Sequence, residues 1–177
     1  MKRPKATILL ASLVCIVLSA CVAPTPAPPQ ALPASTSIPF TSLMQSDAPG
    51  ANQENAAIYF AGSSAEAEAL GPVLNDASMM EQIMSVNFDE AIAVVVFRGQ
   101  MPSTGYGIAV KSLTAAGTGV AIQAELTDPA PDQMTGAALT FPSEVLKINR
   151  KDIELTPGMI WTLNANGDTM AQAQYPR

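Results

Sequence analysis

The sequence predicts a mainly β protein with minor α content, an antiparallel sandwich or open barrel with one or two short helices near the start of its folded domain. Three observations support this class. Residues 91–97 form an uninterrupted apolar run, typical of a strand covered on both faces. Residues 119–126 alternate between apolar and polar side chains, as a strand with one solvated face does. The Asn166-Gly167 pair between two apolar segments favours the positive φ angles of a tight hairpin.

The domain begins with a strand and a short helix. The apolar residues 57–60 are expected to form the strand. Ser63 precedes Glu66 by three positions, which is the spacing of a helix capping box. The helix that follows is expected to end near Leu70, because Gly71-Pro72 interrupts it.

A second short helix is predicted over residues 79–86, with an apolar face consisting of Met80, Ile83 and Met84. Trp161 alternates with apolar neighbours and is expected to fill the core. The remaining strands are expected at residues 106–113, 134–141, 145–148, 159–163 and 169–173.

The N-terminus has the three-part layout of a secretory signal. Cationic residues at positions 2, 3 and 5 precede an apolar run over residues 6–20, and small residues lead to Cys21. The run is shorter than the roughly 20 residues that a membrane-spanning helix requires. Its Leu-Ser-Ala-Cys ending resembles a bacterial lipobox, in which the cysteine is acylated and becomes the new N-terminus. The alternative is an ordinary signal peptide that contains a cysteine.

This reading predicts three segments: a lipoprotein signal peptide at 1–20, a tether rich in Pro, Ala and Ser at 21–55, and a β domain at 56–177. The mature chain would lie outside the cytoplasm, in the cell envelope, anchored to a membrane by palmitate or similar acyl chains on Cys21. The tether is expected to be extended and semi-rigid. Residues 38–40 interrupt its composition, which leaves a short strand or a docking segment open there.

Composition excludes several classes of function. Three of the nine basic residues lie in the signal, so the mature chain carries six Lys or Arg against fifteen Asp or Glu, a net charge of −9 that argues against nucleic acid as a partner. The chain has no histidine, and its two cysteines lie in the signal and at the lipidation position. Catalysis by Ser-His-Asp or Cys-His groups is therefore excluded.

We expect no enzyme activity, no cofactor and no metal. An enzyme would need carboxylates alone, and the best-placed candidates are Asp89 and Glu90 before the central strand. Three acidic residues near one another, Glu125, Asp128 and Asp132, lack the glycine-punctuated ligand spacing of a calcium loop.

The candidate partner-binding loop joins two of the most apolar strands and comprises Gln100, Met101, Pro102, Ser103, Thr104, Gly105 and Tyr106. Proline fixes one φ angle, glycine permits a positive one, and the two hydroxyls can bond nearby backbone groups. A stiff, exposed loop on a rigid sheet loses little entropy on docking. The alternative is a plain connector whose Tyr106 packs into the core.

Three segments in this order resemble the C-terminal domain of the PrcB family of protease complex subunits. Residues 94–108 resemble its apolar strand and Thr-Gly-Gly-Tyr-like turn, with Ser103 to Tyr106 where a second glycine is common. Residues 126–131 are similar to a proline-containing turn, and residues 141–148 to a proline followed by a short strand. The resemblance implies a lipid-anchored, non-catalytic partner that assembles with or steadies an extracytoplasmic protease or another envelope protein.

Residues 101–106 also resemble the Asn-Pro-Thr-Thr-Gly-Tyr loop of chagasin-type inhibitors of papain-like cysteine proteases, with Met101 where asparagine is expected. This second resemblance implies direct protease inhibition as the alternative function.

Overall fold

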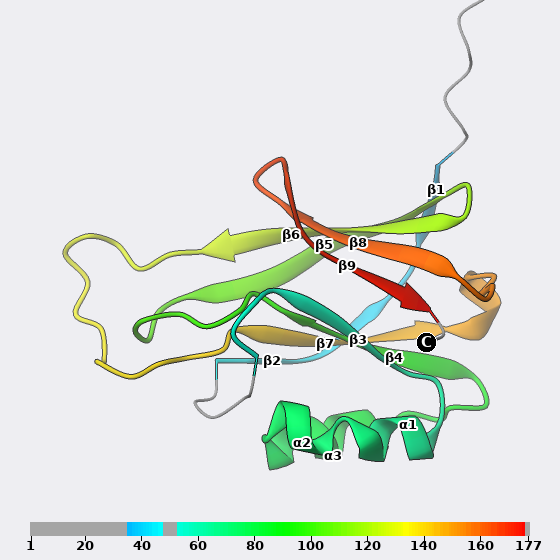
Figure 1. The fold of residues 1–177 in the computed structure, drawn as a ribbon, viewed down its shortest axis with the longest axis horizontal. Helices are drawn as coiled ribbons and strands as arrows, with labels where there is room; N and C mark the ends of the chain where they lie inside the picture. The colour runs from blue at the N-terminus through cyan, green and yellow to red at the C-terminus, as the bar shows by residue number, and fades with distance from the viewer. Residues whose placement is uncertain (1–34, 48–52, 176–177) are drawn as a thin grey trace, which may run out of the picture. The chain divides into compact units, whose positions relative to one another are not determined.

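The computed structural model describes residues 35–47 and 53–175. The predicted signal peptide, Cys21 and most of the predicted tether lie outside these residues. The described chain forms two sheets (Figure 1). The five-stranded sheet has the order β1 (Thr36–Ile38), β5 (Gly107–Ala116), β6 (Gly119–Thr127), β8 (Met159–Ala165) and β9 (Asp168–Tyr175). The four-stranded sheet has the order β2 (Thr41–Ser46), β7 (Ser143–Asn149), β4 (Ala91–Phe97) and β3 (Ala57–Ala61).

Three short helices cover the outer face of the four-stranded sheet, so that the described β domain has three layers (Figure 1). These helices are α1 (Ser64–Ala69), α2 (Gly71–Leu74) and α3 (Ala77–Met84), and a 3₁₀ turn, η1 (Arg150–Asp152), follows β7. None of the helices in the described part of the chain is long and apolar enough to cross a bilayer.

The predicted antiparallel sandwich is confirmed, with one exception to its strand direction. Neighbouring strands pair antiparallel except β6 and β8, which pair parallel from Gly119↔Ile160 to Ala124↔Ala165. The hairpin predicted between β8 and β9 is present. Asn166 and Gly167 both have positive φ angles, 54° and 90°, as a two-residue turn of this kind requires.

Strand β4 lies between two separate cores, as its continuous apolar sequence predicts. All seven of its residues are buried. Ile92, Val94 and Val96 face the other sheet. The side chains that face the helices are those of Ala91, Ala93, Val95 and Phe97. Trp161 is fully buried in the core between the sheets, as predicted, and its ring centroid lies 5.3 Å from that of Phe60.

A buried carboxylate links the two sheets. Glu144 of β7 is 1% exposed and points into the core between them. The hydroxyl of Ser42 in β2 donates to its Oε1 at 2.5 Å, and the backbone N–H of Val110 in β5 donates to its Oε2 at 2.5 Å. Val110 lies where the β5–β6 register shifts, so the carboxylate satisfies an N–H beside a bulge.

The helical region differs from the sequence prediction in two details. Gly71-Pro72 ends α1 as expected, but the same pair begins α2, since proline suits the first turn of a helix. Asp76 caps α3, and the helix therefore starts at Ala77, two residues earlier than predicted. It buries Met79 and Ile83, whereas Met84 is 41% exposed.

Two predicted boundaries also change. Residues 36–46, within the expected tether, form β1 and β2, so the folded domain starts before residue 56. A short strand near residues 38–40 was one of the two alternatives left open by the sequence. Strands do lie on both sides of Pro39, since β1 ends at Ile38 and β2 begins at Thr41. Ile38 is 2% exposed and belongs to the core. The strand predicted at residues 134–141 is wrong: this segment is a loop whose only bridge in the described chain joins Thr140 to Met101.

Candidate functional site

The predicted partner-binding loop connects β4 to β5 at one end of the sandwich, and glycines shape both of its ends. Gly99 and Gly105 have φ angles of 102° and 93°, which side chains rarely adopt. At the start of the loop, the N–H of Gln100 donates to the carbonyl of Glu54 at 2.9 Å. A Cβ at Gly99 would lie 2.9 Å from that same carbonyl oxygen, so this close approach of two backbones requires glycine.

A second loop, residues 128–142, runs beside the first, and hydrogen bonds join the two. Met101 and Thr140 exchange two backbone hydrogen bonds, with N···O distances of 2.8 and 3.0 Å. The Thr140 hydroxyl donates to the carbonyl of Ser103 at 2.8 Å. The Thr104 N–H donates to the Gly136 carbonyl at 3.1 Å, and the Gly136 N–H donates to Thr104 Oγ1 at 2.7 Å. We call residues 99–106 and 128–142 together the two-loop platform (Figure 1).

Arg98 holds the base of the two-loop platform. Its Nη1 donates to the carbonyls of Gly107 at 3.2 Å and Thr127 at 2.7 Å, and its Nη2 lies 2.5 Å from Asp128 Oδ1. The guanidinium also lies over the ring of Tyr106, 5.0 Å from the ring centroid. With its side chain only 10% exposed, Arg98 fixes the strand ends from which both loops leave.

The surface of the two-loop platform carries exposed apolar side chains. Met134 is 98% exposed and Leu139 is 51% exposed. They are two of four large hydrophobic side chains that are exposed in the described chain; the others are Met84 and Ile160. Such side chains on a hydrogen-bonded scaffold can enter a partner's pocket with little loss of conformational freedom.

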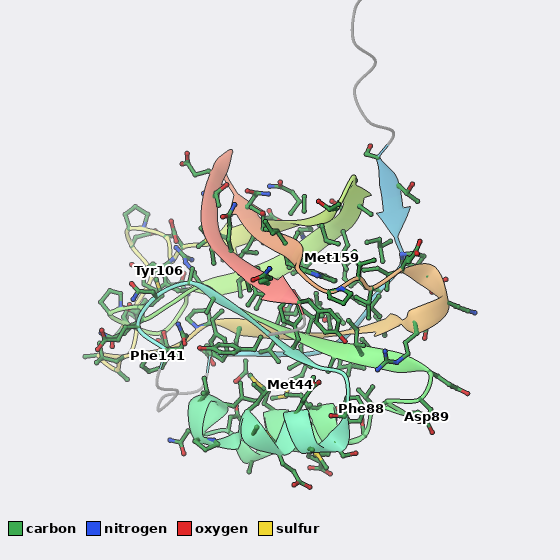
Figure 2. All side chains as sticks on the ribbon, turned by 45° about the vertical axis from the view of Figure 1, so that its right-hand side comes forward. Met44, Phe88, Asp89, Tyr106, Phe141 and Met159 are labelled. Carbon is green, nitrogen blue, oxygen red and sulfur yellow. The ribbon has the colours of Figure 1, made fainter. Side chains whose placement is uncertain are left out.

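The structure brings the predicted loop residues together but gives them unequal roles. Gln100 and Pro102 are exposed, and the other five residues are half-buried. Tyr106 belongs to neither core cluster and packs under Arg98 instead. Figure 2 shows Tyr106 and Phe141 at the end of the sandwich that bears the loops, and Asp89 at the opposite end.

Sequence reasoning missed the second loop and Arg98 as parts of this site. The sequence predicts a proline-containing turn at residues 126–131 and a strand at residues 134–141 where the structure has one long loop. The available signal was composition, since residues 128–138 contain two prolines and a glycine but few side chains able to fill a core. The role of Arg98 depends on carbonyls far along the chain and leaves no local pattern.

The acidic residues considered for catalysis or calcium do not converge. Asp128 pairs with Arg98, and Glu125 pairs with Lys111 at 2.6 Å. This ion pair holds the pKa of the Glu125 carboxyl below its ordinary value, through the hydrogen bond from Lys111 and then its charge. Asp89 and Glu90 are exposed, and no group of three potential metal ligands occurs within residues 35–47 and 53–175.

Comparison with known proteins supports one resemblance. Residues 92–149 match the family model described as PrcB C-terminal, which confirms the resemblance to the PrcB family. The matched segment runs from β4 to β7 and contains the whole two-loop platform. No curated protein and no solved structure matches the chain significantly.

Proposed function

We propose, with the PrcB C-terminal match at residues 92–149 as the premise, that this chain is a non-catalytic subunit or regulator of an extracytoplasmic protease complex. In this proposal a lipid on Cys21 holds the chain to a membrane, and the two-loop platform contacts the protease or another envelope protein. The observation that carries the proposal is that the segment shared with a protease-complex family contains both loops and the strands that present them.

The geometry of the platform supports a binding role. Its two loops are joined by five hydrogen bonds between residues 101–104 and 136–140, so neither loop needs to be ordered by the partner. Met134 and Leu139 are exposed apolar side chains of the second loop that a partner can contact. Exposed apolar side chains on a fixed backbone are typical anchors in an interface between proteins.

The platform is tested by co-purification from solubilised membranes of the native host. Met134→Asp places a charge at an exposed tip and is expected to reduce partner recovery at least tenfold. Met84→Asp is the matched control, since it changes another exposed methionine, on α3, and is expected to leave recovery unchanged. Equal recovery of every partner by the two variants and the native chain would contradict the docking role.

The lipid anchor is tested separately. Metabolic labelling with palmitate should mark the native chain and should not mark Cys21→Ser, which should also leave the membrane fraction. An unlabelled native chain would contradict the lipid anchor and would not bear on the docking role of the two-loop platform.

The second candidate function is direct inhibition of a papain-like cysteine protease, and exposed Pro102 beside the chagasin-like residues 103–106 favours it. It is tested by titrating papain with the purified chain. Loss of activity at micromolar concentration, reversed by Pro102→Asp, would support inhibition, and full activity at that concentration would exclude it.

A further inference from the structure

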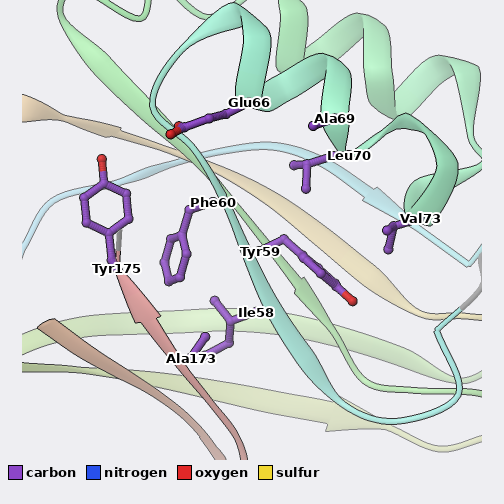
Figure 3. A pocket seen from close by; sticks show the side chains of 9 residues that line it. All are labelled: Ile58, Tyr59, Phe60, Glu66, Ala69, Leu70, Val73, Ala173 and Tyr175. Carbon is purple, nitrogen blue, oxygen red and sulfur yellow. The ribbon is translucent and has the colours of Figure 1, made fainter. Parts of the chain in front are cut away.

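A cavity of about 270 Å³ lies along β3, the outer edge of the four-stranded sheet. The helices border it on one face of the sheet and β9 borders it on the other. Three successive residues of β3 line it, together with side chains from α1, α2 and β9 (Figure 3). The full lining consists of Ile58, Tyr59, Phe60, Glu66, Ala69, Leu70, Val73, Ala173 and Tyr175. We call this cavity and the β3 edge beside it the edge groove.

β3 is the edge strand of the four-stranded sheet and lacks several of the features that usually block an edge. Among the described residues it pairs with β4 alone, in a regular antiparallel register over five residues. Alternate residues of such a strand direct their N–H and C=O groups away from the partner strand, toward the open side. The strand Ala-Ile-Tyr-Phe-Ala contains no proline, no charged residue and no bulge. Its backbone can therefore accept a further strand.

Apolar side chains line the edge groove on both faces of the sheet. Ile58 and Phe60 pack toward the five-stranded sheet, where Tyr175 lies 5.2 Å from Phe60 between ring centroids. Tyr59 faces the helices, next to Leu70 and its neighbours in α1 and α2. A strand added here would bury successive side chains on alternate faces, as β4 does, and so would need apolar residues at consecutive positions.

The charges beside the groove nearly balance. The lining includes one charged residue, Glu66, which is exposed and uses one oxygen to accept a hydrogen bond from the Gly62 N–H at 2.7 Å. The guanidinium of Arg150 lies on the other side of Gly62 and donates to the carbonyls of Phe88 and Gly62, which leaves its positive charge in place. The groove therefore sets no charge requirement on its occupant.

We propose that the edge groove binds an extended peptide segment of a partner, with three or more consecutive apolar residues, which adds to β3 as a fifth strand of this sheet. Side chains of α1, α2 and β9 flank the β3 edge on both faces. A second copy of this chain would bring the same flanking elements to the contact, so the groove favours a single extended segment over a second copy. This proposal does not depend on the two-loop platform, which other residues form.

The test measures binding of a fluorescein-labelled peptide, Lys-Ala-Val-Val-Val-Ser amide, to the full chain in mild detergent by fluorescence anisotropy. Two further peptides carry N-methyl groups on alternate residues, one series on the odd positions and one on the even positions. Because only one series of N–H groups faces β3 in a paired strand, one methylated peptide should lose at least tenfold in affinity and the other should bind like the parent.

Protein variants locate the site. Ala69→Trp fills the groove from an exposed position and is expected to weaken binding at least tenfold, whereas Ala65→Trp, on an exposed position of the same helix outside the lining, is the control. Met134→Asp should leave peptide binding unchanged, which separates this proposal from the proposed function. Equal binding of both methylated peptides, unaffected binding by Ala69→Trp, or a dimer in sedimentation that excludes the peptide would each overturn the proposal.

Discussion

Replacing Gly105 with alanine is the most direct perturbation of the contact between the two loops. Gly105 has a φ of 93°, outside the regions that an alanine occupies easily, and strain of this kind costs about 1–3 kcal/mol. The new Cβ would also lie 3.2 Å from the Cβ of Pro129 in the second loop, so one loop must shift. We expect Gly105→Ala to lower the free energy of unfolding by about 1–3 kcal/mol.

Gly107→Ala is the matched control, two residues further along the chain. Gly107 lies in β5 and has no positive φ, and its added Cβ would meet Thr127 at 3.5 Å, which is an ordinary contact. This change is expected to be neutral or to stabilise by up to about 1 kcal/mol, because alanine restricts the unfolded chain. Urea unfolding followed by tryptophan fluorescence measures both variants, since Trp161 is buried.

The comparison also has a functional arm. Gly105→Ala should reduce partner recovery in the co-purification assay even at temperatures where the variant is fully folded, since the loops no longer hold their native contact. Equal free energies of unfolding for the two variants, or native recovery by Gly105→Ala, would refute the reasoning that this glycine sets the loop geometry.

Three further predictions concern other polar contacts. Glu144→Leu should lower the free energy of unfolding by about 1–3 kcal/mol, because it leaves a buried backbone N–H without an acceptor, and Glu144→Gln should cost less, since its amide oxygen can replace one acceptor; chemical denaturation of both variants decides this. Arg98→Met keeps the aliphatic stem but removes three hydrogen bonds, and hydrogen exchange should become faster in both loops and not in β8. Lys111→Met should raise the pKa of the Glu125 carboxyl toward its ordinary value, as followed by NMR titration. Because Lys111 lowers the pKa of Glu125 in the folded state, the stabilising effect of this pair is present above the unfolded-state pKa of the carboxyl. It is lost as the pH falls through the folded-state pKa.

Much of the fold could be predicted because its signals are local. The continuous apolar run at residues 91–97 indicated a strand covered on both faces, and β4 does lie between two cores. The Asn-Gly turn and the Ser63 cap were also recognisable, because turn and cap chemistry involves neighbours a few residues apart. The loop at residues 99–106 could be chosen by its glycines and proline before its contacts were known.

The errors arose where distant residues compete with local preference. Residues 134–141 have the composition of a weak strand, yet their polar groups bond to Met101, Ser103 and Thr104, more than thirty residues away in sequence. Residues 36–46 lie next to a proline-rich stretch but pair with β5 and β7. In each case a long-range partner outweighs the local pattern.

The sequence by itself determined the class of the protein: alternating apolar residues require sheets, and the lack of histidine removes catalysis by Ser-His-Asp or Cys-His groups. Only the tertiary structure decided which strand would be an open edge, where the buried Glu144 would find its donors, and that two loops would form one surface. The physical reason is that pairing order and loop contacts depend on backbone groups, which are the same in nearly every residue and carry no signature in the sequence.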